Sequence, residues 1–181
     1  MLRSRQRGFN LIELMIVIAI ISFLVVISLP SVAEMLQNSR TRSVAESLQN
    51  GIRFAQTEAA RLSRLTTIEM TAAGAWTVTY VTLGTNDTLV NPLQSSPGGI
   101  SEFVSITPTD TGKYALQFND LGRVKEGASA AGSFSAITAA EAVFVVTNSK
   151  APRRLSVRVS PSGKVRMCDP DKAFSSDPTG C

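Results

Sequence analysis

The sequence contains no histidine and only two cysteines among its 181 residues. Catalytic sites that rely on a histidine base and tetrahedral zinc sites built from histidine and cysteine are therefore excluded by residue count. Without a base to activate a nucleophile, the scattered serines and aspartates do not indicate catalysis. The sequence predicts a protein that is not an enzyme and that has no metal site and no cofactor.

Charged residues are scarce as well, at 18% of the chain, and the basic excess is concentrated at one end. The formal net charge is +4, and Arg3, Arg5 and Arg7 supply most of it. Without these three arginines, 15 basic residues face 14 acidic ones. A chain of this length, 44% hydrophobic, can form one modest globular domain and one additional element.

A long apolar run follows the basic residues. Residues 9–29 read FNLIELMIVIAIISFLVVISL, in which only Asn10, Glu13, Ser22 and Ser28 are polar. A helix of this length can cross a bilayer, and the preceding arginines favour a cytoplasmic amino terminus with an exported remainder. The sequence after the run, PSVAE, is unlike the cleavage site of an ordinary secretory signal and leads into helix-like sequence.

The motif Gly8-Phe9-Asn10-Leu11-Ile12-Glu13-Leu14, followed by the apolar run and Pro30, resembles the class III leader of type IV prepilins and type II secretion pseudopilins. The resemblance implies that prepilin peptidase removes residues 1–8 as a leader peptide, cutting between Gly8 and Phe9, and that Phe9 is then N-methylated. It also implies a single-pass inner-membrane protein with a periplasmic C-terminal domain. Other pilins and minor pilins would be its partners in an extracellular pilus.

Glu13 and Pro30 are the two unusual residues of this region. An acid near the membrane interior is costly without a partner, so it suggests function. In pilins such an acid is thought to neutralise the amino terminus of a neighbouring subunit, which would make Glu13 an assembly residue; the alternative is an interfacial acid on a simple anchor. Proline removes a backbone donor, so we expect Pro30 to kink or locally melt the helix, with a plain helix end as the alternative.

After Pro30 the sequence is typical of an amphipathic helix to about residue 65. Apolar residues recur at steps of three or four, at Val44, Leu48, Ile52, Ala55, Ala59 and Leu62. We expect residues 9–29 to form the transmembrane and filament-core half of one long helix, and residues 30–65 to form the amphipathic half. Gly51 is expected to weaken this half by about 1 kcal/mol relative to alanine.

Residues 66–181 predict a β-rich domain, because short β-branched and aromatic segments alternate with turn residues. The predicted strands span residues 66–70, 75–82, 100–106, 113–118, 141–147, 153–159 and 164–168. Residues 71–74 and 160–163 are predicted hairpin turns. Residues 84–99 are expected to form a long polar loop, and residues 127–135 a flexible connector.

The fold class is therefore α+β: a pilin fold with a long kinked N-terminal helix packed on an antiparallel sheet. The segments AQTEAARLSRLTTIEM with AWTVTYV, and SPSGKVRMCDP with DPTGC, resemble the GspH/FimT branch and its FimU-like subunits. This implies a minor pilin of type IV pilus assembly near the filament tip. The alternatives are a minor pilin that binds DNA for uptake and a type II secretion minor pseudopilin. Residues 84–135 carry no resemblance.

Cys168 and Cys181 both lie near the carboxyl end, which the leader would send to an oxidising compartment. A disulfide between them is therefore expected, closing a loop that it could stabilise by roughly 3 kcal/mol. The alternative, a metal or redox role for two free thiols, is disfavoured because their spacing is not that of a CxxC or zinc motif.

Residues 150–168 carry six basic residues and no acid. In an alternating strand Arg154 and Arg158 share a face, which predicts a basic edge that could bind DNA phosphates. DNA-binding FimT-like minor pilins carry a Gly-Arg-x-Arg motif that Gly163-Lys164-Val165-Arg166 resembles, with Lys164 in place of the first arginine. Lysine keeps the charge but loses the bidentate guanidinium. The alternative is a solvated hairpin or a docking face for acidic surfaces of neighbouring subunits.

Overall fold

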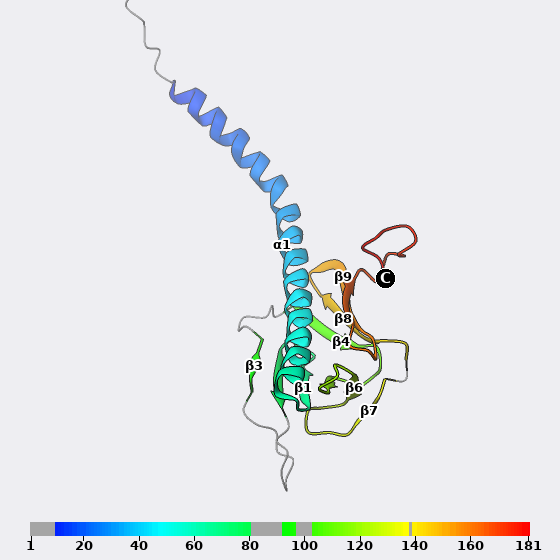
Figure 1. Ribbon diagram of the computed structural model, residues 1–181. Helices are drawn as coiled ribbons and strands as arrows, with labels where there is room; N and C mark the ends of the chain where they lie inside the picture. The colour runs from blue at the N-terminus through cyan, green and yellow to red at the C-terminus, as the bar shows by residue number, and fades with distance from the viewer. Residues whose placement is uncertain (1–9, 81–91, 97–102, 138) are drawn as a thin grey trace, which may run out of the picture. The chain divides into compact units, whose positions relative to one another are not determined.

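The structure, a computed structural model, describes residues 10–80, 92–96, 103–137 and 139–181, without the side chains of residues 28–30 (Figure 1). The chain divides into two compact units, residues 1–36 (unit 1) and residues 37–181 (unit 2). Helix α1, Leu11–Leu62, contributes residues to both. The predicted processing residues Gly8 and Phe9 lie outside the described residues. Pro30 lies within α1, but the predicted kink falls on residues 28–30, whose side chains lie outside the description.

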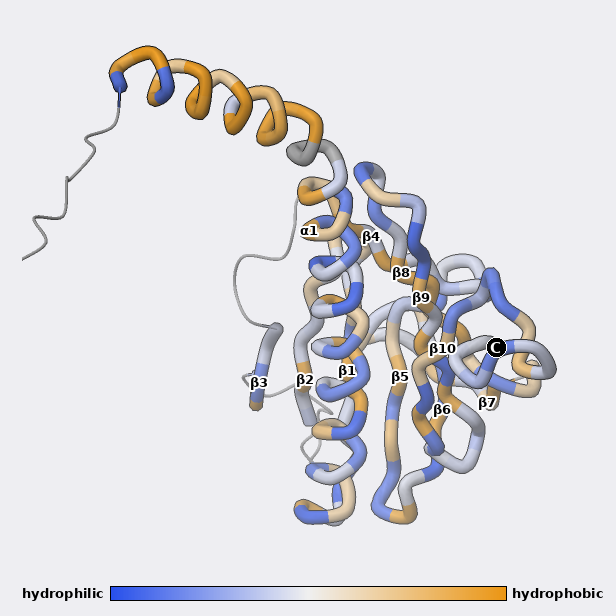
Figure 2. Tube along the Cα trace, turned by 90° about the horizontal axis from the view of Figure 1, so that it is seen from above, coloured by the Kyte–Doolittle hydropathy of each residue, from blue (hydrophilic) through white to orange (hydrophobic). Residues whose placement is uncertain are grey.

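The described part of unit 1 is helical and apolar. The helix begins directly after Asn10, a residue type favoured before the first helical turn, and Glu13 lies in that turn, where a negative charge complements the helix dipole. Its large apolar side chains are exposed, from Leu11 at 74% to Met35 at 75%. Figure 2 shows that hydrophobic residues predominate along this part of the helix. Among the described residues no single helix is long and apolar enough to cross a membrane, but Leu11–Ile27 and Ser31–Leu62 pass that test as a pair.

Unit 2 contains two antiparallel sheets in addition to its part of α1. The six-stranded sheet has the order β3-β2-β1-β5-β6-β7, and the four-stranded sheet has the order β10-β9-β8-β4. The strands of the first sheet are β1 (Thr66–Met70), β2 (Trp76–Tyr80), β3 (Gln94–Ser95), β5 (Ala115–Phe118), β6 (Val124–Gly127) and β7 (Phe134–Ala136). Those of the second are β4 (Val104–Pro108), β8 (Ala142–Asn148), β9 (Ala151–Val159) and β10 (Val165–Cys168). The predicted α+β class is confirmed.

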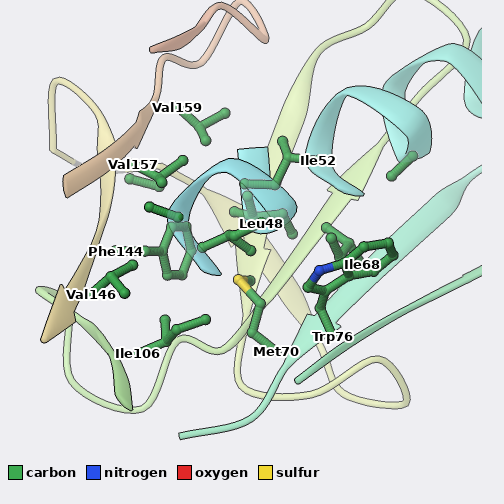
Figure 3. Close-up of a cluster of buried hydrophobic side chains, with 14 of the residues drawn as sticks. Leu48, Ile52, Ile68, Met70, Trp76, Ile106, Phe144, Val146, Val157 and Val159 are labelled. Carbon is green, nitrogen blue, oxygen red and sulfur yellow. The ribbon is translucent and has the colours of Figure 1, made fainter. Parts of the chain in front are cut away.

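One hydrophobic core joins α1 to both sheets within unit 2 (Figure 3). The predicted helical stripe supplies Leu48, Ile52, Ala55 and Ala59, each 0% exposed, so its spacing is confirmed. Gly51 is more than the weak point that its helix propensity suggested. A Cβ atom there would lie 2.8 Å from ring atoms of Trp76, so the absence of a side chain lets the indole pack against the helix.

The predicted turns are confirmed. At residues 160–163 the Gly163 amide donates to the Ser160 carbonyl at 2.8 Å, and Gly163 has a φ of 84°, a conformation that favours glycine. At residues 71–74 the Gly74 amide donates to the Thr71 carbonyl at 3.0 Å.

The strand prediction was incomplete in the middle of the chain. Strands β3, β6 and β7 were missed, and β3 lies inside the predicted 84–99 loop. Residues 127–135 are not simply a flexible connector, because Gly127 pairs with Phe134 across β6 and β7. These strands have two to four residues and few β-branched side chains, so pairing with neighbours rather than local propensity holds them in the sheet.

Candidate functional site

The first candidate site is the start of α1. Glu13 is exposed and is the only charged residue among residues 10–33. Its neighbours Leu11, Ile12 and Leu14 are exposed by 74%, 61% and 58%. The site is thus a single carboxylate on a helix that lacks an apolar cover within the described chain.

The second candidate site is the basic hairpin of β9 and β10. The strand register places Arg158 directly opposite Arg166, and Val143 of β8 opposite Arg158 on the other side. Both guanidinium groups contact one carboxylate: Glu141 Oε2 lies 3.0 Å from Arg166 Nη2 and 3.5 Å from Arg158 Nη1. These side chains are partly exposed, at 41% for Arg166, 27% for Arg158 and 22% for Glu141. Two positive charges therefore share one negative charge.

Arg154 is paired as well, with an acid from the C-terminal loop. Its Nε donates to Asp171 Oδ2 at 3.1 Å, and a second contact joins Nη2 to Asp171 Oδ1. The hydrogen bond and the opposite charge raise the pKa of Arg154 and lower the pKa of Asp171. The pair lies at the surface, where such bridges contribute little to stability.

Lys164 differs from the three arginines. It is exposed, and no ion pair joins it to another side chain in the part of the chain that the structure describes. Its backbone amide donates to Ser160 Oγ at 3.0 Å, which helps fix the turn. Of the four residues considered for phosphate binding, Lys164 is therefore the one that forms no ion pair within the described chain.

The sequence interpretation missed the two acids that pair with this hairpin. Glu141 comes before β8 and Asp171 follows β10, so both lie outside the acid-free segment 150–168. Their partners depend on strand register and on the path of the C-terminal loop. Glu141 is the first residue of the predicted strand 141–147. This position was the only local indication that it could lie close to the hairpin.

The C-terminal loop is closed by the predicted disulfide. Cys168 and Cys181 are joined, with their Cα atoms 5.2 Å apart. Inside the loop the Asp169 amide donates to the Thr179 carbonyl at 2.8 Å, and Lys172 Nζ contacts Asp177 Oδ2 at 2.5 Å. Hydrogen bonds from Lys172 and Thr179 lower the pKa of Asp177. The loop is held by its own contacts and by Arg154, while Phe174 is 67% exposed.

Four of the described aromatic side chains pack against groups of the same chain, so their rings are not free faces on which nucleic-acid bases could stack. Trp76 is 4% exposed and donates its indole N–H to Ser47 Oγ at 3.1 Å, and Phe118 is 0% exposed. Tyr80 lies beneath the Arg64 guanidinium at 5.8 Å, and Phe103 beneath Lys150 Nζ at 5.4 Å. These rings therefore pack in the core or against cations of the same chain.

Comparison with known proteins gives two family matches. Residues 44–163 match the family described as type II transport protein GspH, and residues 3–29 match the prokaryotic N-terminal methylation motif. Comparison with curated proteins finds no significant match.

Solved structures show the same fold. The type IV minor pilin FimU of Pseudomonas aeruginosa aligns with a TM-score of 0.55 at 16% identity, covering 75% of this chain and 92% of FimU. The solution structure of Escherichia coli GspH aligns with a TM-score of 0.50 at 15% identity, covering 73% of this chain and 89% of GspH. At these identities the similarity concerns the fold.

Proposed function

This chain belongs to the GspH family of minor pilins and pseudopilins, and we propose that it acts as a minor pilin in type IV pilus assembly, near the filament tip. The family match covers the second half of α1 and most of the sheets, and the methylation motif covers the apolar start. Together they support a subunit that is anchored first and then assembled.

The observation that carries the proposal is the exposed apolar surface of unit 1. Burying a large apolar side chain stabilises by roughly 1.5–3 kcal/mol, so a helix lined by Leu11, Ile16, Ile20 and Phe23 needs a nonaqueous cover. The inner membrane supplies that cover before assembly. The helices of neighbouring pilins supply it afterwards, in the core of the filament.

In this mechanism Glu13 aligns the subunit. Its carboxylate lies among exposed apolar side chains and gains most from a positive group on a neighbour, because a charge in an apolar environment is costly without a partner. The amino group of Phe9 on an adjacent, processed subunit is the partner that the leader motif implies.

The test is complementation of a deletion strain with Glu13→Ala, Glu13→Gln and the control Glu34→Gln. We expect both Glu13 variants to reach the membrane and to be cleaved before Phe9, but to lower the number of surface pili at least about tenfold, whereas Glu34→Gln restores piliation. Electron microscopy counts the pili, and mass spectrometry of the N-terminal peptide reports cleavage and methylation. Normal piliation with Glu13→Ala would refute the assembly role.

A type II secretion pseudopilin is the second candidate, and the name of the matched family favours it. The same deletion strain separates the two, because loss of secreted enzymes with normal pili assigns the chain to secretion.

DNA uptake is the third candidate, supported by exposed Lys164 in a turn that resembles the DNA-binding motif. Pairing of Arg154, Arg158 and Arg166 with acids reduces the charge available to phosphate. Salt-sensitive DNA binding that is lost in Lys164→Ala/Arg166→Ala would support uptake, and its absence at low salt would oppose it.

A further inference from the structure

A surface cavity of about 570 Å³ lies in unit 2, near the C-terminal end of α1. Its walls come from both sheets: Gln117 of β5, Lys125 of β6, Ala136 of β7 and the Pro161–Ser162 turn between β9 and β10. Leu65, just after α1, completes the wall. Its lining includes neither the paired arginines nor any residue of the disulfide loop.

Backbone contacts hold the walls in place. The Val124 amide of β6 donates to the Pro161 carbonyl at 3.3 Å, which ties the two sheets together. In the β5–β6 turn, Asn119 Oδ1 accepts hydrogen bonds from the amides of Leu121 and Arg123 at 3.1 and 2.8 Å. A cavity with fixed walls can bind a ligand without first being ordered.

The lining is apolar and positively charged. Leu65, Val124, Ala136, Ile137 and Pro161 supply apolar surface. Arg123 and Lys125 are exposed in the same lining, which contains no acid, and neither forms an ion pair within the described residues. In contrast to Arg154, Arg158 and Arg166, which pair with acids of the same chain, these two charges are available to a ligand.

The surface near the cavity has the features of a protein contact. In the described residues of unit 2, the exposed large hydrophobic side chains are Leu65, Leu121 and Phe174. Leu65 lines the cavity, and Leu121 lies two residues before Arg123. The sheet order also ends at β7 in the described chain, so the strand that contributes Ala136 has an edge where an extended backbone can align.

We propose that this cavity binds an extended peptide segment of a partner protein in which carboxylate side chains stand beside apolar ones. The apolar side chains enter the cavity while the carboxylates pair with Arg123 and Lys125. A nucleic acid fits less well, because protein–DNA contacts are polar and need many cations along a phosphate backbone. The proposal goes beyond the assembly role of Glu13 and does not depend on which filament contains the subunit.

The test measures peptide binding to the full-length protein in detergent micelles, using fluorescence anisotropy with an uncharged dye. The probe is the peptide GLDVELG, and its amide analogue GLNVQLG is the matched control. We expect the acidic peptide to bind about tenfold more tightly than the amide analogue, as one or two charge-assisted contacts provide.

Three variants locate the binding. Arg123→Gln/Lys125→Gln should weaken binding of the acidic peptide about tenfold, and Leu65→Ser should weaken it about threefold because the apolar wall is lost. The control Arg40→Gln/Arg53→Gln removes two exposed cations of α1 that form no ion pair with any described residue and lie outside the cavity lining. It should leave binding unchanged. Circular dichroism checks that each variant is folded.

Three results would overturn the proposal. Equal affinity for the acidic and amide peptides, or equal affinity of the cavity variant and the α1 control, would show that the cations do not select the ligand. A single-stranded oligonucleotide that displaces the peptide and depends on Arg123 and Lys125 would assign the cavity to nucleic acid. The peptide-binding result does not depend on whether the Glu13 variants form pili. The proposal for the cavity and the proposed assembly role can therefore fail independently.

Discussion

Phe23 in unit 1 and Phe144 in unit 2 are the same residue type in opposite environments, because Phe23 is 67% exposed and Phe144 is 1% exposed. The other apolar side chains of the two units differ in exposure in the same way. Unit 2 covers its apolar side chains with its own sheets and helix, whereas the apolar side chains of unit 1 stay uncovered by the described chain. Unit 2 therefore buries its core with its own elements, whereas the described part of unit 1 leaves its large apolar side chains exposed, as the proposed membrane anchor and filament core would require.

The charged residues differ in the same way. Unit 2 pairs Glu141, Asp171 and Asp177 with cations of its own, whereas no ion pair occurs in the described part of unit 1. Glu13 has no ion pair among the described residues, which leaves it available for the partner that the proposed assembly role requires.

The largest expected effect compares Phe144→Ala with Phe23→Ala. Phe144→Ala should lower the free energy of unfolding of unit 2 by about 3–5 kcal/mol, because it leaves a cavity in the core. Phe23→Ala should change it by less than about 0.5 kcal/mol, because the side chain contacts little within the chain. Urea unfolding of the full-length protein in micelles, followed by Trp76 fluorescence, measures both.

Equal destabilisation by the two phenylalanine variants would break the comparison, since it would mean that unit 1 packs against unit 2. Ile52→Ala and Ile18→Ala repeat the experiment with a second pair, because Ile52 is 0% and Ile18 is 54% exposed.

A somewhat smaller effect is expected from the disulfide of unit 2. Cys168→Ser/Cys181→Ser should lower the free energy of unfolding by about 3 kcal/mol, because the open loop has more conformations in the unfolded chain. Chemical denaturation measures the loss, and the reduced wild-type protein should match the variant. If reduction left the denaturation midpoint unchanged, the hydrogen bonds of the loop and Arg154 would suffice to hold the C-terminal end.

Local patterns were enough to predict much of this architecture. The steps of three and four from Val44 to Ala59 gave the buried face of α1, and β1 has the predicted bounds Thr66–Met70. The two cysteines were paired correctly because no other partner exists in the sequence. These features depend on residues close together in the chain or on residue count.

What could not be predicted depends on residues that are distant in the sequence. Glu141 meets Arg166 only because β8, β9 and β10 are neighbours in one sheet, and Asp171 meets Arg154 only through the folded loop. The cavity beside Arg123 joins both sheets. Residues 84–135 carried no recognisable motif in the sequence, but the GspH family match spans them as part of residues 44–163. An acid-free stretch of sequence is therefore a poor measure of local charge.

The smallest expected effect is a pH dependence in unit 2. Hydrogen bonds and opposite charges from their partners lower the pKa values of Asp171 and Asp177 below the usual range for aspartate, so the ionised forms are favoured in the folded state. Their contribution to stability is present above about pH 4 and is lost as pH falls through the lowered pKa values. Asp171→Asn/Asp177→Asn should therefore be less stable than wild type at pH 5, and this difference should shrink toward pH 2.

Thermal unfolding between pH 2 and pH 5 measures this difference, with Asp120→Asn as the control because Asp120 is exposed and has no ion pair among the described residues. The residual difference at pH 2 should come mainly from Asp177, whose pKa is lowered further by two donors from Thr179. A constant difference across the range would mean that the two aspartates stabilise unit 2 through contacts that do not depend on their ionisation. The ion pairs of Asp171 and Asp177 would then add nothing measurable to the stability of unit 2.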